Sequence, residues 1–212
     1  MSTHILIADD HAIVRRGIIQ LLLDEYPFAV IGEAANTEEL LQKVISGKWD
    51  VVICDINMPG RSGIDALLQI KQSVPGLPVL IMSMYPEDQY ALRAFKAGAS
   101  GYLGKETIHY NLVKAIEKVL SGKKFITPSI AEKLANSLEE EKENEKQLHE
   151  HLSNREFEVF ILLASGKPTS AIAEKLSLNS NTVSTYRTRI MEKMKMKSNA
   201  DLIRYALEKK MI

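Results

Sequence analysis

The chain has 212 residues, 45% of them hydrophobic and 25% charged, and its 27 basic and 27 acidic side chains give a formal net charge of zero. These values are typical of a soluble globular protein with one large domain or two small ones. No apolar run approaches the roughly 18–20 residues of a membrane span, and no basic segment precedes an apolar one at the start, as in a secretory signal. The single cysteine, Cys54, excludes an internal disulfide. We therefore expect a cytoplasmic protein without a membrane partner.

Short apolar runs alternate with amphipathic stretches over about the first 125 residues. Runs that are apolar on both faces are typical of parallel strands buried by helices. Thr37, followed by two glutamates, suits a helix start, and Gly98 and Gly122 stand where helices should end. The pattern predicts a doubly wound α/β domain, flavodoxin-like if its strand order is 2-1-3-4-5. The expected strands are 5–8, 29–32, 51–54, 79–82 and 101–103, and the expected helices are 12–25, 37–46, 62–73, 86–97 and 108–121.

The rest of the chain has a different pattern. Residues 138–146 are mostly charged and have no apolar face, which favours a partly helical, solvated linker. Four helices are expected after it, at about 154–164, 168–176, 180–195 and 199–209. We therefore divide the chain into a first domain at 1–126, a linker at 127–149 and an all-α domain at 150–212. Residues 153–212 hold 11 basic against 6 acidic side chains, a modest indication of a polyanionic partner that a merely solvated basic face would explain equally well.

Polar side chains follow four of the five predicted strands. Asp9 and Asp10 follow the first strand, Asp55 the third, Ser83 the fourth and Lys105 the fifth. The carboxyl ends of parallel strands meet at one edge of the sheet, where this fold forms its ligand crevice. We therefore expect the five side chains to form one pocket.

The residue types in this pocket suit phosphoryl transfer. Clustered carboxylates, with the backbone carbonyl of Asn57 as a further ligand, favour Mg²⁺, a hard cation that keeps waters. Asp55 would attack a phosphoryl donor and become an acyl phosphate, while Lys105 neutralises the phosphoryl oxygens. The Ser83 hydroxyl can then donate a hydrogen bond to the phosphoryl group.

Each of these residues also has a simpler interpretation. Asp10 or His11 can serve only as a helix N-cap, and an aspartate after a strand is often just a solvated loop residue. Their occurrence together, at four strand ends, is what favours the functional interpretation.

The first domain resembles the receiver domains of two-component response regulators over about residues 3–124. The resemblance implies phosphoryl transfer to Asp55 from a phosphohistidine on a sensor histidine kinase, with Ser83 and Tyr102 as the switch pair, although Tyr102 also suits a plain core aromatic. Gly104 departs from the family, where leucine is common before the lysine, and its flexibility would loosen the aim of Lys105. The matching strings are Ile7-Ala8-Asp9-Asp10-His11, Asp55-Ile56-Asn57-Met58-Pro59-Gly60, Ser83-Met84-Tyr85 and Ala97-Gly98-Ala99-Ser100-Gly101-Tyr102-Leu103-Gly104-Lys105.

The second domain contains a predicted helix-turn-helix. A short helix at 171–176 and a turn at 177–179 precede a longer helix at 180–194 with Asn179 as its N-cap. The seam between the helices would consist of Ile172, Leu176, Leu178, Val183 and Ile190. Amides, hydroxyls and guanidinium groups on the opposite face suit a recognition helix in the major groove, although an ordinary solvated helix face has the same spacing. The candidate DNA-binding residues are Thr169, Asn181, Thr182, Ser184, Thr185, Arg187, Thr188 and Arg189.

Residues 150–212 resemble the LuxR-type DNA-binding domain, and the whole chain resembles the NarL/FixJ group of response regulators. The strings are Leu152-Ser153-Asn154-Arg155-Glu156-Phe157-Glu158-Val159, Ala164-Ser165-Gly166, Ile172-Ala173, Asn179-Ser180-Asn181-Thr182-Val183-Ser184-Thr185-Tyr186, Lys193-Met194 and Ser198-Asn199-Ala200-Asp201-Leu202. Lysines that are frequent in the family are missing near Thr169 and at Asn181, which implies weaker non-specific affinity. Dimerisation on paired half-sites, through the last helix in this family, would compensate.

The leading hypothesis is a transcription regulator that binds promoter DNA, is switched by phosphorylation at Asp55 and acts as a homodimer. One alternative is a DNA-binding protein that no longer needs phosphate. Another is a phosphohydrolase with an aspartyl-phosphate intermediate, but enzymes of the haloacid dehalogenase type place the nucleophile after their first strand, with a second aspartate where this chain has Asn57. We therefore do not expect an enzyme.

Overall fold

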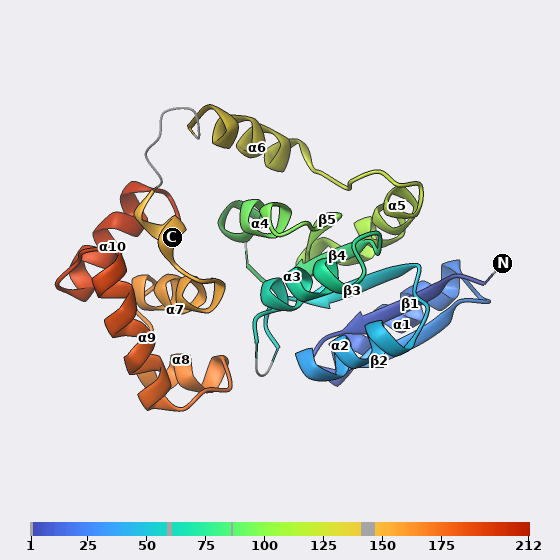
Figure 1. Ribbon diagram of the computed structural model, residues 1–212, viewed down its shortest axis with the longest axis horizontal. Coiled ribbons are helices and arrows are strands. Elements are labelled where there is room, and N and C mark those ends of the chain that lie inside the picture. Colours follow the sequence, from blue (N-terminus) through green and yellow to red (C-terminus); the bar gives the residue numbers. More distant parts are fainter. Residues whose placement is uncertain (1, 59–60, 86, 141–146) are drawn as a thin grey trace. The chain divides into compact units, whose positions relative to one another are not determined.

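The computed structural model describes residues 2–58, 61–85, 87–140 and 147–212 (Figure 1). Its backbone contacts divide the chain into two compact units, Met1–Leu134 and Ala135–Ile212. Within the described ranges, no helix has the length and apolar character that crossing a bilayer requires.

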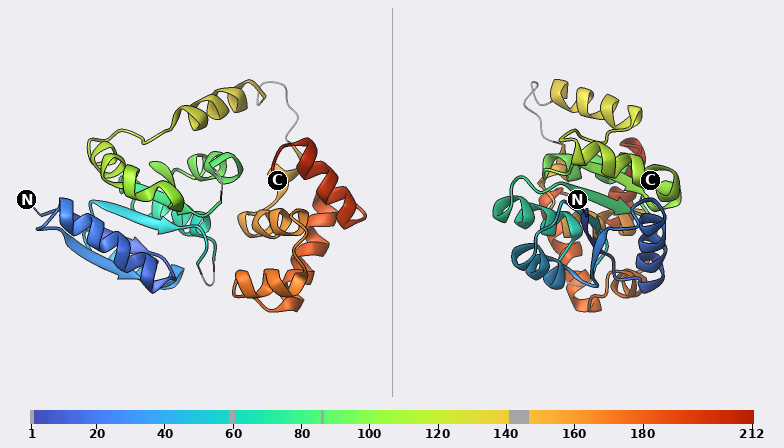
Figure 2. Two further views of the ribbon diagram at one scale, coloured as in Figure 1. Left: turned by 180° about the vertical axis from the view of Figure 1, so that it is seen from behind. Right: turned by 90° about the vertical axis from the view of Figure 1, so that its right-hand side faces the viewer.

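The first unit is built on a five-stranded parallel sheet with the expected order β2-β1-β3-β4-β5. The central strands β3 and β4 are buried along their whole length, which explains their continuous apolar runs. Helices α1 and α5 pack together, α2 packs on α3, and the two pairs cover opposite faces of the sheet (Figure 2). The strands are β1 His4–Ala8, β2 Val30–Ala34, β3 Val51–Asp55, β4 Val79–Ser83 and β5 Gly101–Gly104; the helices are α1 Ala12–Glu25, α2 Thr37–Ser46, α3 Gly63–Ser73, α4 Glu87–Lys96 and α5 Ile108–Leu120.

Two local features differ from the expected elements. Strand β2 lies at 30–34, whereas its apolar run predicted 29–32, because its bounds follow the pairing with β1, from Val30 opposite His4 to Ala34 opposite Ala8. Helix α2 begins at Thr37 as expected, but the side chain that caps it belongs to the preceding Asn36, whose Oδ1 accepts from the backbone N–H of Glu39.

Glycine is required at two positions of the first unit for different reasons. A Cβ atom at Gly63 would lie 2.0 Å from the carbonyl oxygen of Asp55, so only glycine lets α3 begin against the end of β3. Gly98, with φ of 99°, follows α4 in the left-handed conformation that ends helices. Gly63 therefore shapes the edge of the sheet at which the site forms, whereas Gly98 ends α4 before β5 begins.

The segment between the two predicted domains contains helix α6, Pro128–Glu140, and a short 3₁₀ helix, η3, Leu148–His151. The Thr127 hydroxyl accepts from the backbone N–H of Ile130 and so caps α6, while the Ile130 side chain is buried. The charged stretch 138–146 lies largely outside the described residues. The domain boundaries at 126 and 150 stay predictions, since the division by contacts falls inside α6.

The second unit contains the four expected helices, α7 Asn154–Ala164, α8 Thr169–Lys175, α9 Ser180–Lys193 and α10 Asn199–Glu208. Helix α7 packs on α8, α9 and α10. Its Phe157 and Phe160 are buried, as are Ile190 of α9 and Leu202 of α10. Ser153 and Glu156 form a capping box that starts α7. The unit is thus a small helical domain with a core of its own.

Candidate functional site

Acidic side chains gather at the carboxyl end of the sheet. Asp9 and Asp10 follow β1, and Asp55 ends β3. Oxygen atoms of these three residues, with a ring nitrogen of His11, all lie within 4.8 Å of one another. Asp9 and Asp55 are almost completely buried. The structure thus brings together the carboxylates that the sequence placed at neighbouring strand ends.

Lys105 joins two of these carboxylates. It follows β5 directly, and its Nζ lies 2.6 Å from Asp9 Oδ2 and 2.7 Å from Asp55 Oδ2. Burial alone would lower the pKa of Lys105, but the Asp55 carboxylate and the hydrogen bonds to both aspartates raise that pKa above its ordinary value. Burial raises the pKa of Asp55 to about 6, against the opposing effect of the Lys105 ammonium. The pocket therefore contains one cationic side chain and several carboxylates. A further cation would reduce its net negative charge.

Some buried oxygens of this pocket have no hydrogen-bond partner among the described residues. They include Asp55 Oδ1 and Asn57 Oδ1. A buried carboxylate oxygen without a donor is costly, and a bound cation would relieve that cost. The donor set of carboxylates suits a hard divalent cation that prefers oxygen ligands.

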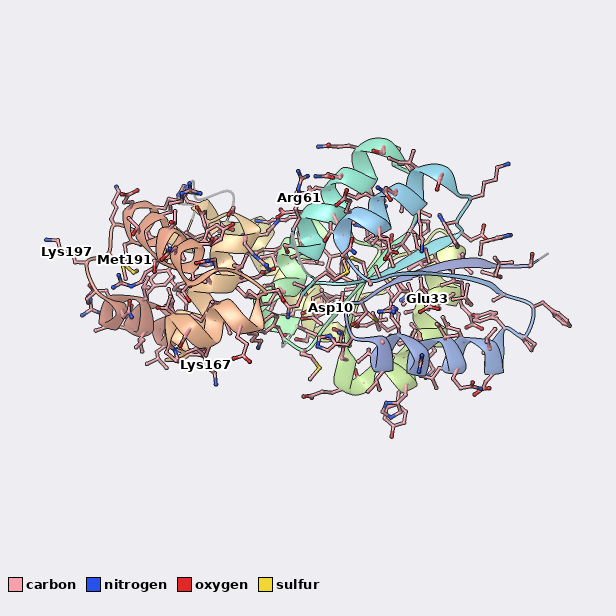
Figure 3. The ribbon with its side chains drawn as sticks, turned by 90° about the horizontal axis from the view of Figure 1, so that it is seen from below. Asp10, Glu33, Arg61, Lys167, Met191 and Lys197 are labelled. Carbon is pink, nitrogen blue, oxygen red and sulfur yellow. The ribbon has the colours of Figure 1, made fainter. Side chains whose placement is uncertain are left out.

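The structure does not support the interpretation of Asp10 or His11 as a side chain that only caps a helix. His11 occupies the N-cap position of α1 but makes no capping bond with its side chain. The His11 ring instead lies 2.7 Å from Asp10 Oδ1, while the backbone N–H of His11 donates to Asp9 Oδ1. Arg15 also holds this loop. It donates to the Asp9 carbonyl oxygen at 2.7 Å and pairs with Glu33 of β2. Asp10 and Glu33 are labelled in Figure 3. No sequence pattern points to Arg15, because Glu33 is 18 positions away and the contact with Asp9 is made by a backbone carbonyl.

Ser83 and Tyr102 meet at one backbone segment. Ser83, at the end of β4, accepts from the backbone N–H of Tyr85 at 2.9 Å. The Tyr102 hydroxyl, from β5, donates to the Tyr85 carbonyl oxygen at 3.0 Å. Tyr102 is fully buried, so its ring points into the unit. Burial, only partly offset by a hydrogen bond with Ser83, raises the pKa of the Tyr102 hydroxyl far above its ordinary value. Tyr102 is therefore a core aromatic that also makes a polar contact with the loop after β4.

The second unit carries the predicted helix-turn-helix as α8 and α9. Asn179 caps α9, as expected, by accepting from the backbone N–H of Asn181. Of the predicted seam, four side chains are buried and Leu178 is half-buried. The candidate DNA-binding side chains are exposed except for Thr169, Thr182 and Arg187, which are half-buried. The face that the sequence assigned to nucleic acid is therefore largely open to solvent.

Polar side chains on α9 are already oriented by local bonds. The hydroxyls of Ser184, Thr185 and Thr188 each donate to the backbone carbonyl four residues earlier. Arg187 donates through Nε to Asn199 Oδ1 at the start of α10. Nε faces Asn199, which leaves the terminal nitrogens of the guanidinium group for a phosphate or a base.

Ion pairs fix α8 and α9 against α7. No sequence pattern predicted these ion pairs. Arg155 pairs with Glu158 at 2.6 Å and donates to the carbonyl oxygen of Leu176 at the end of α8, and both charged side chains are buried. Lys193, at the end of α9, pairs with Glu156 at 2.6 Å. The spacing of Arg155 and Glu158 on one helix predicts that they can meet, but not that they are buried under the turn.

Two family models match the chain, and they cover its two halves. The response regulator receiver domain matches residues 5–117, and the model of bacterial regulatory proteins of the luxR family matches residues 150–206. The oxygen regulatory protein NreC of Staphylococcus carnosus is 36% identical over 213 residues, which cover 98% of each chain. The response regulator GacA of Pseudomonas aeruginosa is 34% identical over 208 residues, covering 98% of this chain and 97% of that protein.

Solved structures agree with these matches. A two-component response regulator of the LuxR family from Aurantimonas has 36% sequence identity and a TM-score of 0.59, covering 65% of this chain and 98% of its own. RcsB from Salmonella enterica serovar Typhimurium, bound to promoter rprA in the presence of the phosphomimetic BeF3−, has 25% identity and a TM-score of 0.62, covering 96% of this chain and 98% of its own.

Proposed function

Because the chain belongs to the two-component response regulators that combine a receiver domain with a LuxR-type DNA-binding domain, and this family consists of transcription regulators rather than enzymes, we propose that phosphorylation of Asp55 switches its binding to DNA. The observation that carries the proposal is the contact of Lys105 with both Asp9 and Asp55 inside a buried acidic pocket. We further propose a sensor histidine kinase as the phosphoryl donor and double-stranded promoter DNA as the target. Such partners imply a cytoplasmic site of action.

Asp55 is the proposed nucleophile. With its pKa raised to about 6 by burial, the carboxyl group is mostly ionised near neutral pH, as a nucleophile must be. One Asp55 oxygen attacks the phosphorus atom of a phosphohistidine, the P–N bond breaks, and the histidine nitrogen leaves with the bonding electrons. The new P–O bond makes Asp55 an acyl phosphate. Lys105 lies 2.7 Å from one Asp55 oxygen and would stabilise the negative charge of the transferred group.

Mg²⁺ is the proposed cofactor, since receiver domains generally bind it at an acidic pocket. Asp9, Asp10 and Asp55, with the backbone carbonyl of Asn57, would hold the ion. When bound, Mg²⁺ supplies positive charge at the phosphoryl oxygens. Its binding would also satisfy Asp55 Oδ1, the buried oxygen without a partner.

Ser83 and Tyr102 are the proposed switch residues. The Ser83 hydroxyl can donate to a phosphoryl group on Asp55 while its oxygen keeps the Tyr85 N–H. Tyr102 would adjust with the loop, because its hydroxyl is bound to the same residue. The result is a shift of the segment between β4 and α4 when Asp55 is phosphorylated.

Helix α9 is the proposed recognition helix, with its N-terminal half in the major groove. Arg187 and Arg189 would contact phosphates or guanines, and the hydroxyls and amides would contact base edges and backbone. The full set proposed for DNA contact is Thr169, Asn181, Thr182, Ser184, Thr185, Arg187, Thr188 and Arg189. Few cations in this set favour a homodimer on paired half-sites, formed when Asp55 is phosphorylated.

Labelling with a small phosphodonor tests the assignment of Asp55. The wild-type chain should gain one phosphoryl group when Mg²⁺ is present and none in EDTA, while Asp55→Ala should gain none. Equal labelling of wild type and Asp55→Ala would show that the acceptor lies elsewhere. Asp24→Ala, at an exposed aspartate of α1, is the matched control and should label like the wild type.

A further inference from the structure

A hydrogen bond joins the start of α4 to the start of α6. The Thr127 hydroxyl donates to Glu87 Oε2 at 2.8 Å across 40 positions of sequence. Glu87 is the first residue of α4, and Thr127 immediately precedes α6. Helix α6 is the part of the chain that leads to the second unit. The bond therefore ties the helix next to the phosphorylation switch to the segment that carries the DNA-binding domain.

On its switch side, Glu87 lies two residues after Tyr85. Tyr85 contacts both switch residues: its N–H donates to Ser83 and its carbonyl accepts from Tyr102. The Tyr85 ring stacks on that of Tyr90 in α4, with ring centres 4.6 Å apart and planes 19° apart, and both rings are buried. This stacking makes the loop and the first turn of α4 one packed body. A displacement of Tyr85 should therefore be passed to Glu87.

On the other side, Thr127 holds the first turn of α6. Its oxygen accepts from the Ile130 N–H at 3.3 Å while its hydrogen goes to Glu87, so one hydroxyl both caps α6 and attaches it to α4. Ile130 is 1% exposed, which makes it the apolar anchor beside this polar one. A hydrogen bond loses most of its strength once donor and acceptor move beyond about 3.5 Å, so a shift of Glu87 by about 1 Å would break it.

We propose that the Glu87–Thr127 hydrogen bond fastens α6 to the unphosphorylated receiver and that phosphorylation releases it. Resting on the phosphorylation of Asp55 proposed above, this inference names how that event reaches the linker. Ser83 turns toward the phosphoryl group, Tyr85 follows, Glu87 moves with α4, and the first turn of α6 loses its polar attachment. Glu87 is a positioning residue in this scheme and touches neither phosphate nor DNA.

Hydrogen exchange of the α6 backbone amides in the full chain tests the proposal. Wild-type chain with Mg²⁺ and beryllofluoride should exchange these amides roughly 3- to 10-fold faster than untreated chain, the range expected for the loss of one hydrogen bond. Glu87→Ala should show the faster exchange without beryllofluoride and respond little to its addition. Glu87→Gln retains an acceptor oxygen and should behave like the wild type. Ser129→Ala, which removes an exposed hydroxyl from the same turn of α6, is the matched control and should also behave like the wild type.

The outcomes separate this inference from the proposed function. If beryllofluoride changes exchange around Ser83 in the wild type but not in Asp55→Asn, and α6 does not respond, the Glu87–Thr127 link is wrong while Asp55 stands. If beryllofluoride changes nothing anywhere, the proposed function fails. Should Glu87→Ala not fold, as judged by Trp49 fluorescence, the pair Thr127→Ser and Thr127→Val replaces it. Serine keeps the hydroxyl and the slow exchange, and valine should lose both; equal exchange in the two would overturn the proposal.

Discussion

Replacing Asp55 with asparagine should stabilise the first unit when no divalent metal is present. Asp55 is 1% exposed, and burial raises its pKa from an ordinary value of 3.8 to about 6. The folded state therefore binds this proton more tightly than the unfolded state, so stability falls as pH rises from about 4 to about 6. Above that window the ionised carboxylate costs about 3 kcal/mol, at ~1.4 kcal/mol for each pH unit between the two pKa values. Asparagine carries no charge and avoids this cost.

The Asp55→Asn variant does not recover the whole free-energy cost of the buried carboxylate. Lys105 loses a charged partner in Asp55→Asn, although it keeps Asp9 at 2.6 Å. We therefore expect the free energy of unfolding to rise by about 2–3 kcal/mol near pH 7.5 and by no more than about 1 kcal/mol near pH 4.5, where wild-type Asp55 is protonated in the folded state.

Urea unfolding in EDTA, followed by tryptophan fluorescence, measures this difference. Trp49 is the only tryptophan of the chain and lies in the first unit, where its Nε1 donates to the Lys43 carbonyl oxygen, so its signal reports that unit. Asp24→Asn, at an exposed site on α1, is the control and should change stability by less than about 0.5 kcal/mol. A gain that is the same at both pH values, or no gain near pH 7.5, would refute the reasoning from burial.

The remaining predictions concern backbone space, DNA contact and the buried ion pair. Gly63→Ala should destabilise the first unit by about 2–4 kcal/mol, because its Cβ would meet the Asp55 carbonyl oxygen, whereas Gly104→Ala has space and an ordinary φ of −70° and should be neutral or stabilising by up to ~1 kcal/mol in the same urea assay. Arg189→Ala should weaken DNA binding and reduce the slope of log affinity against log salt by about 0.9 in a fluorescence anisotropy titration, because one cation is lost from the proposed DNA-binding face, while Arg204→Ala on α10 should leave that slope unchanged. Arg155→Met should destabilise the second unit by about 3–5 kcal/mol, measured by circular dichroism, because the buried Glu158 carboxylate loses the guanidinium that pairs with it; a loss below about 1 kcal/mol would contradict the importance of this pair.

The sequence predicts the pocket well because few positions determine it. Asp9, Asp55, Ser83 and Lys105 stand at strand ends, and a parallel sheet brings those ends together whatever the details of packing. Sequence does not reveal which oxygens Lys105 contacts. That choice depends on side-chain positions across 96 and 50 residues of sequence.

Other features depend on tertiary contacts that no local pattern contains. The Glu87–Thr127 bond and the contacts of Arg15 join residues whose neighbours in sequence give no sign of a partner. The helix-turn-helix could be predicted from the sequence, because seam residues such as Ile172 and Val183 recur with helical spacing on either side of the turn. The burial of Arg155 beneath that turn has no such signal, since arginine is ordinarily exposed.

The central claim is that phosphorylation at Asp55 governs binding to DNA. Its most direct test is the affinity of the full chain for a two-half-site promoter fragment, together with solution mass, with and without beryllofluoride and Mg²⁺ at fixed salt. We predict that beryllofluoride raises the affinity at least about tenfold and shifts the mass toward a dimer in the wild type, with neither effect in Asp55→Asn. Unchanged affinity in a wild-type chain that has taken up beryllofluoride would contradict the claim and indicate a DNA-binding protein that does not need phosphate.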